Sequence, residues 1–286
     1  MLSPMRKTIG AFILLSALSS NLWAIPGQVE NNNYKVVLSE TLPGIDGPGI
    51  LLAPDAAITV TVTDKFRSQQ VSYPLKAYAI RSYFLLGDNL NLVTRTSLAT
   101  DPSPRYGFLQ LNLPSPSDSR QFENLKQYSL SPDQQVLLLV ADKGPGAPWV
   151  GIAQLADNPL SLQWLYAEAA GVNLFKSVFA APVSTLTISD PVGWAADSLS
   201  AAFLISVGDG SLDAQGKPLL KDYLAGLERT DTGWKATVQP VDLSAYHFHS
   251  GAALTDLRCD GQKISLFLTS DNATNPVEVD FKLNLP

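Results

Sequence analysis

The sequence is poor in the residues that build metal, redox and nucleic-acid sites. It has one cysteine, two histidines and two methionines in 286 residues, and only 16% of its residues are charged. One cysteine cannot form an intrachain disulfide, a zinc knuckle or an iron–sulfur site. Acidic residues outnumber basic ones by 26 to 20, and the resulting net charge of −6 argues against a nucleic-acid partner. The hydrophobic share of 45% in turn excludes a disordered chain.

The first 24 residues have the features of a secretory signal peptide. Arg6 and Lys7 precede an apolar run over residues 9–18, and a short polar stretch then leads to Ala24. About ten apolar residues are too few for a membrane-spanning helix, which needs roughly 20. We therefore expect cleavage after Ala24, with an uncleaved N-terminal anchor as the alternative.

Cleavage would leave residues 25–286 as the mature chain. Loss of Arg6 and Lys7 leaves 18 basic residues against 26 acidic ones, which makes the net charge −8. Both methionines are lost too, so Cys259 would carry the only sulfur, as suits an oxidising compartment. No later segment has the length of a membrane span. We expect a soluble protein exported to a bacterial periplasm.

A repeated aspartate turn organises the mature chain. Each turn precedes an apolar run typical of a β-strand, and the spacings between the aspartates are 33, 45, 64 and 63 residues. The turn residues are Asp55, Asp88, Asp133, Asp197 and Asp260. A leading strand precedes each turn, as at 252–260, and further strands follow, as at 161–167. The unit is thus up to four antiparallel strands in about 40 to 50 residues.

Four antiparallel strands per unit are the pattern of a β-propeller blade, because a ring of blades buries both faces of every sheet. We predict an all-β protein with one propeller domain over residues 25–286. Five blades are expected, six are an alternative, and two β-sandwich domains are the competing architecture. The strand at 34–38 is expected to complete the last blade and close the ring. Residues 208–221 are expected to form a loop, and 219–229 a short helix or the start of a strand.

The turn resembles the Ser-Pro-Asp-Gly signature of TolB-like, or PD40, propeller repeats. The closest match is SPDQQVLLLVAD at 131–142, followed by CDGQKISLFLTSD at 259–271. The turn glycine of that family is present only as Gly261. Its place is taken elsewhere by Ala56, Asn89, Gln134 and Ser198. The resemblance implies a propeller fold and favours a binding or scaffolding role.

The two histidines of the chain, His247 and His249, form the most specific polar motif. Residues two apart on an extended segment face the same side, so both imidazoles could bind one divalent metal. Asp242 or Asp256 could complete such a site, and Cys259 is a weaker third ligand. The alternatives are surface residues with ordinary hydrogen bonds, or a pH-sensitive contact.

Two loops are further candidates. Lys143 and Trp149 lie at the ends of a rigid Gly/Pro-rich segment that could present them to a partner, the alternative being an ordinary connection between strands. Acidic residues around 208–221 could bind calcium through oxygen ligands, although a solvated acidic loop is the alternative. These residues are Asp209, Asp213 and Asp222.

The sequence has no nucleophile elbow, no zinc-protease motif and no phosphate-binding loop. We therefore predict a non-enzymatic, exported binding or scaffolding protein whose propeller rim or channel mouth engages a protein or an envelope ligand. The alternative is a hydrolase, either glycosidase-like, with two carboxylates about 5 to 9.5 Å apart, or a metal enzyme using His247 and His249. The candidate carboxylates are Asp46, Asp101, Asp190 and Asp256. No cofactor is expected beyond such a divalent metal, and the oligomeric state is left open.

Overall fold

The computed structural model describes residues 27–41, 57–76, 79–97, 101, 103–115, 119–143, 148–157, 160–167, 172–173, 183, 185–189, 191–243, 252–260, 263–270 and 276–282. Every regular element among them is a β-strand. None of these residues belongs to a helix that is long and apolar enough to cross a membrane. The all-β prediction is confirmed.

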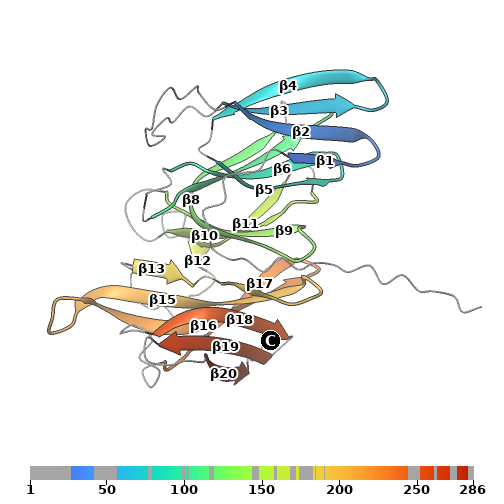
Figure 1. Cartoon of the computed structure of the whole chain (residues 1–286). Helices are drawn as coiled ribbons and strands as arrows, with labels where there is room; N and C mark the ends of the chain where they lie inside the picture. The colour runs from blue at the N-terminus through green and yellow to red at the C-terminus, as the bar shows by residue number, and fades with distance from the viewer. Residues whose placement is uncertain are drawn as a thin grey trace, which may run out of the picture.

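The strands form four antiparallel sheets (Figure 1). The first sheet contains β1 (Gly27–Glu30), β2 (Tyr34–Thr41), β3 (Ala57–Asp64) and β4 (Gln69–Lys76), in that order. The second contains, also in chain order, β5 (Ala79–Leu86), β6 (Asn89–Arg95), β7 (Tyr106–Asn112), β8 (Arg120–Leu130), β9 (Val136–Ala141), β10 (Trp149–Gln154), β11 (Ser161–Ala167) and β12 (Val172–Asn173).

The third sheet contains β13 (Thr185–Ile188), β14 (Gly193–Trp194), β15 (Ser200–Leu212), β16 (Pro218–Thr230) and β17 (Gly233–Pro240). Both β13 and β14 pair with β15, so together they form one interrupted leading strand. The fourth sheet contains β18 (Ala252–Asp260), β19 (Lys263–Ser270) and β20 (Val277–Lys282).

Alternate side chains of the inner strands lie in different cores, which is why these strands are apolar throughout. On β9, Val136 and Leu138 face one buried cluster, whereas Leu137 and Leu139 face another. On β15, Phe203 and Leu204 are divided in the same way. Four such clusters separate five successive layers: β1–β4, β5–β8, β9–β11, β13–β17 and β18–β20. Burial on both faces does not fit two β-sandwiches, in which every sheet has one solvated face.

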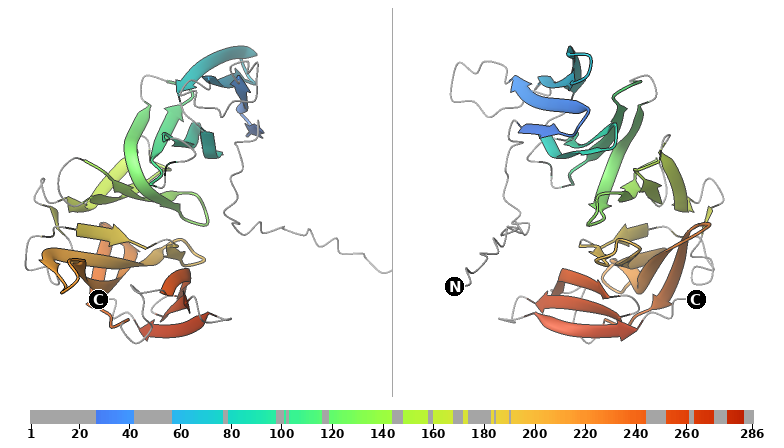
Figure 2. Two further views of the ribbon diagram at one scale, coloured as in Figure 1. Left: turned by 60° about the vertical axis from the view of Figure 1, so that its left-hand side comes forward. Right: turned by 90° about the vertical axis from the view of Figure 1, so that its right-hand side faces the viewer.

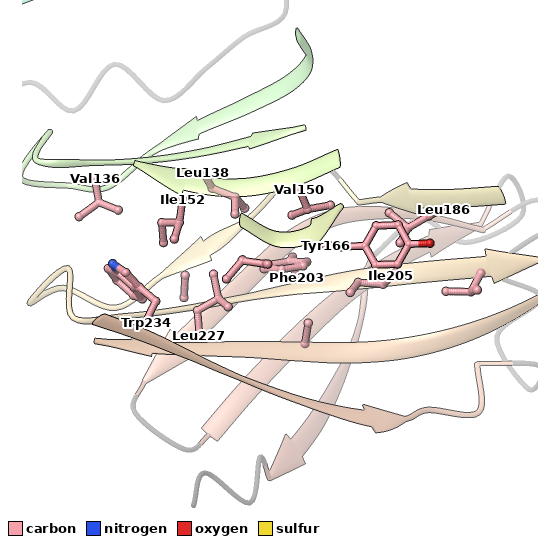
Figure 3. Close-up of a cluster of buried hydrophobic side chains, with 14 of the residues drawn as sticks. Val136, Leu138, Val150, Ile152, Tyr166, Leu186, Phe203, Ile205, Leu227 and Trp234 are labelled. Atoms are coloured by element: carbon pink, nitrogen blue, oxygen red, sulfur yellow. The ribbon is translucent and has the colours of Figure 1, made fainter. Parts of the chain in front are cut away.

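Figure 3 shows the cluster between the second and third sheets. Val136, Leu138 and Ile152 point from one side toward Phe203 and Leu227 on the other. In Figure 2 the layers follow one another along an arc, with the first sheet at one end and the fourth at the other. A closed ring of five or six blades stays a prediction.

Strand β8 joins two layers. Its first residues pair with β7, and from Leu125 onward it pairs with β9. Asn124, with a left-handed φ of 57°, lies at the change of partner. The second and third predicted units therefore share one hydrogen-bonded sheet.

Two predictions are wrong. The strand predicted at 34–38 is β2, which pairs with β1 and β3 in the first sheet and does not complete the last one. Its buried Val36 and Leu38 pack in the same cluster as Val60 of β3, and eight consecutive residue pairs join the two strands. The second error is the loop at 208–221, whose flanks extend β15 and β16 into a long hairpin. Residues 219–229 accordingly lie in a strand and form no helix.

Candidate binding surface beside the first sheet

The predicted histidine pair lies outside the described residues, so the metal site at His247 and His249 stays a prediction. Among the residues that are described, no group of three or more histidine, cysteine or acidic side chains could hold a metal ion. Asp256, one proposed third ligand, has its Oδ2 3.0 Å from Nε of Arg258. Cys259 is half-buried, and burial raises the pKa of its thiol, which keeps it protonated.

Lys143 and Trp149 are described, and a partner contact for them stays a prediction. Lys143 is exposed and lies two residues after the end of β9. Trp149 begins β10 opposite Ala141, and its half-buried ring meets that of Trp164 edge-on, with 5.1 Å between the ring centroids. The loop between them, residues 144–147, lies outside the described residues.

The candidate catalytic carboxylates that are described have local partners. Asp101, in the second sheet's β6–β7 connection, accepts a hydrogen bond from the backbone N–H of Ser103 at 2.8 Å. Asp256, in β18 of the fourth sheet, accepts one from the N–H of Leu257 at 2.9 Å. The structure does not bring these two together, because the third sheet lies between the sheets that carry them (Figure 1). Asp46 and Asp190 lie outside the described residues.

The aspartates proposed for calcium serve the β15–β16 hairpin instead. Asp213 accepts hydrogen bonds from the N–H groups of Gln215 and Lys217 and so closes the turn. Asp209 accepts one from Ser211, and Asp222 accepts one from the hydroxyl of Ser206 on the neighbouring strand. These contacts give each aspartate a role in the hairpin, and a calcium site there stays a prediction.

Among the residues that the structure describes, the most exposed aromatic side chain lies at a place that the sequence analysis did not single out. Phe66, at the tip of the β3–β4 hairpin, has 82% of its surface exposed. The Asp64 carboxylate accepts hydrogen bonds from the N–H groups of Phe66 and Arg67, at 2.9 and 3.0 Å. Ser68 then adopts a left-handed φ of 52° and returns the chain to β4. The tip is thus an ordered turn that holds an apolar ring in solvent.

A second set of contacts ties this tip to the turn between β1 and β2. The Lys65 ammonium donates a hydrogen bond to the carbonyl of Asn31 at 2.6 Å and lies 3.2 Å from the Glu30 carboxylate. Asn31 and Asn33 in turn bond to Gly87 and Asp88 in the β5–β6 turn. The hairpin is therefore anchored to two neighbouring turns.

A cavity of about 440 Å³ opens beside Phe66, between the first sheet and the end of β7. We call it the hairpin pocket. Its lining residues are Asn33, Tyr34, Val62, Asp64, Phe66, Arg67, Gln69, Val71, Tyr73, Leu113 and Pro114. The walls combine aliphatic and aromatic side chains with a few polar groups, and Val71 is 49% exposed there. This volume lies within the range of ligand pockets.

Tyr34 is one of the residues that line the hairpin pocket. Burial, helped by the carboxylates of Asp88 and Asp64, raises the pKa of Tyr34 above its ordinary value. Its hydroxyl makes no hydrogen bond with any residue that the structure describes. It can therefore donate to an acceptor that enters the pocket.

A second cavity, of about 480 Å³, is lined by residues of β4, β6, β7 and β8. Its lining residues are Pro74, Thr94, Thr96, Arg105, Gly107, Phe108, Leu109, Gln121, Glu123 and Asn124. Arg105 is 3.1 Å from the carboxylate of Asp142, which also pairs with Lys126 at 3.5 Å. No large exposed hydrophobic side chain lines this cavity among the described residues, whereas Phe66 and Val71 line the hairpin pocket.

No family model matches the chain, and no curated protein matches it either. The TolB-like resemblance therefore stays a prediction. Among solved structures, the chain is similar to hydrazine synthase from Kuenenia stuttgartiensis, with a TM-score of 0.38 and 14% identity over 73% of this chain and 55% of that one. It is similar to a prolyl endopeptidase with a TM-score of 0.41 and 12% identity, over 92% of this chain and 33% of that one.

A third similar structure is the β-propeller domain of the Trilobed protease from Pyrococcus furiosus. Its TM-score is 0.30, at 8% identity, over 92% of this chain and 82% of that domain. This chain thus spans only about half of the hydrazine synthase chain and a third of the endopeptidase. Structures similar to the chain include a β-propeller, and no family is assigned to it.

Proposed function

We propose that this chain is an exported, non-enzymatic binding protein that engages a protein partner at the hairpin pocket. The observation that carries the proposal is Phe66, an exposed aromatic ring on an ordered turn beside a partly apolar cavity. Contiguous exposed apolar surface marks interaction sites in soluble proteins, and the exposed side chains of Phe66 and Val71 both border this cavity. Export is proposed from the signal-peptide features of residues 1–24.

The residue types at the hairpin tip and the order of its turn favour a contact with a protein. Aromatic residues and arginine are enriched among the few side chains that dominate binding energy, and Phe66 and Arg67 are neighbours on this tip. The hydrogen bonds from Asp64 already order the turn, so binding need not pay the full entropy cost of immobilising it. The hairpin pocket can meanwhile take an apolar side chain from the partner.

The test is capture from a periplasmic extract of the source cells on immobilised wild-type chain, Phe66→Ala and Leu212→Ala. Leu212 is a matched control because it is also an exposed hydrophobic residue near a hairpin end, 60% exposed on β15. We expect a protein that the wild type and Leu212→Ala retain equally, and that Phe66→Ala retains about tenfold less, as for a hot-spot truncation. Equal retention by all three would contradict the proposal.

A further inference from the structure

We infer that the partner at the hairpin pocket is a second copy of this chain, with Phe66 of each copy entering the pocket of the other across a two-fold axis. This inference rests on the proposed function of that pocket. In a two-fold interface the same patch meets itself, so the patch must contain both an anchor and a site that receives it.

The hairpin tip meets that requirement. The ring of Phe66 is almost fully exposed, so it leaves its own pocket unfilled. Val62, Val71, Tyr73 and Leu113 line the cavity next to it, and about 440 Å³ is ample room for a phenyl ring. The partly exposed Val71 would be covered by the incoming hairpin. One surface therefore offers both halves of the contact.

The charges around the anchor are complementary to themselves. Lys65 and Arg67 flank Phe66, while Glu30 and Asp64 lie within the same patch. Arg67 is 75% exposed, and its Nε is 3.9 Å from Asp64. An exposed ion pair of this kind contributes little free energy, so Arg67 could pair with a carboxylate of the other copy instead at little cost. A patch with both signs can meet its own copy without net repulsion, although the whole chain carries a charge of −6.

One hairpin from each copy makes a small interface, so we expect reversible association. Sedimentation equilibrium of the purified mature chain, from about 1 to about 200 µM, covers the affinities of small interfaces. The expected result is a monomer–dimer equilibrium that Phe66→Ala weakens at least about tenfold and Leu212→Ala leaves unchanged. Wild-type chain that is monomeric throughout, or a dimer that Phe66→Ala does not weaken, would overturn the inference.

A mixing experiment tests the reciprocal contact directly. Phe66→Ala removes the anchor and leaves the other lining residues of the pocket in place, whereas Val71→Trp keeps the anchor and fills part of the pocket. Each variant alone should dimerise poorly. Their mixture retains one anchor-in-pocket contact and should form more heterodimer than either variant forms homodimer. Absence of this recovery would overturn the inference. Should Val71→Trp fail to fold, Pro114→Trp fills the pocket from the opposite wall.

The two proposals fail in different ways. If the wild type stays monomeric while Phe66→Ala abolishes capture of a different protein, the inference falls and the proposed function stands. If Phe66→Ala changes neither capture nor self-association, both fall.

Discussion

At the scale of single residues, the aspartate turns show how the repeat works without its glycine. In the two turns that follow β8 and β14, an aspartate accepts a hydrogen bond from the N–H group two residues later. The residue between them, Gln134 or Ser198, adopts a φ of 60°. The left-handed backbone conformation raises the free energy of a non-glycine residue by about 1–2 kcal/mol. The hydrogen bonds of the turn hold it there nevertheless.

Gln134→Gly should therefore stabilise the protein. The Gln134 side chain is exposed, so its loss removes the left-handed strain at the cost of some added chain entropy. We expect a gain of about 0.5–1 kcal/mol, measured as a higher urea midpoint. Ser198→Gly should gain less, because the Ser198 hydroxyl accepts a hydrogen bond from the N–H of Asp133 at 3.2 Å. A larger gain at 198 than at 134 would contradict this account.

Asp133 should make stability depend on acid pH. Burial opposes ionisation, but hydrogen bonds to the carboxylate, foremost from the Ser131 hydroxyl at 2.6 Å and the Gln135 N–H, hold the pKa of Asp133 below its ordinary value. A group with a lowered native pKa stabilises the fold above its unfolded pKa, and this contribution is lost as the pH falls through the native pKa.

The stability difference between wild type and Asp133→Asn should thus be constant at neutral pH and shrink below about pH 4. Chemical denaturation at a series of pH values measures it. A difference that stays the same down to about pH 2.5 would show that the charge of Asp133 contributes nothing.

At the scale of strands, a glutamine side chain helps to join the second and third sheets. Gln163 of β11 accepts a hydrogen bond from the N–H of Trp234 at 2.9 Å and donates one to its carbonyl at 2.8 Å. The amide thus pairs with β17 as a neighbouring strand would. Trp234 itself lies in the core between these sheets (Figure 3).

Gln163→Leu should destabilise the chain by about 2 kcal/mol. The N–H and the carbonyl of Trp234, which are partly buried, would both lose their hydrogen-bond partner. Gln121→Leu is the control, since that amide is exposed and bonds only to the exposed Glu123, and it should change stability by less than about 0.5 kcal/mol. Thermal unfolding followed by circular dichroism compares the two. Equal effects would refute a specific role for Gln163.

Strand positions were predictable from the sequence, but their partners less so. The predicted strands at 161–167 and 252–260 coincide with β11 and β18, because apolar runs bounded by turns define a strand locally. The alternation of apolar and polar residues in β2 shows which of its faces is buried, but it does not show which strands pair with it. The strand at 34–38 was therefore assigned to the wrong sheet. The β15–β16 hairpin was missed because its glycine-rich polar sequence is typical of loops.

The hairpin pocket escaped prediction for a similar reason. Leu113 and Pro114, which line it, follow β7 of the second sheet, whereas Phe66 lies in the β3–β4 turn of the first, and no local pattern joins them. One signal was available: a single aromatic residue between Lys65 and Arg67 in an otherwise polar turn. The predicted sites at His247 and His249 and at Lys143 and Trp149 remain untested.

At the scale of the whole molecule, the two end sheets each have one polar face. On β3, Thr59, Thr61 and Thr63 alternate with the buried Val60 and Val62. In the fourth sheet, Ser265 and Asp280 are hydrogen-bonded on the face opposite the core of Ile264 and Leu266. Polar outer faces are typical of terminal units that cap a stack of repeats.

Polar end faces disfavour the closed ring expected from the sequence, so we expect the two end sheets to remain apart in solution. Spin labels at Thr61→Cys and Thr269→Cys, in a Cys259→Ser background, would report the separation by electron–electron double resonance. Sheets packed face to face lie about 10 Å apart, so an open arc should give a distance well over twice that value. The Phe66→Ala change should be added to exclude distances between copies. A separation near the packing distance would show a closed ring.

The shared strand β8 also bears on how the chain comes apart. Because hydrogen bonds run from β5 to β12 without a break, neither of those two layers can separate without opening backbone bonds of the other. The fourth sheet has three strands and is joined to the third by side-chain packing. Backbone amides of β6 and β9 should therefore exchange with solvent together and last, whereas those of β20 should exchange first, through local opening at one end of the stack.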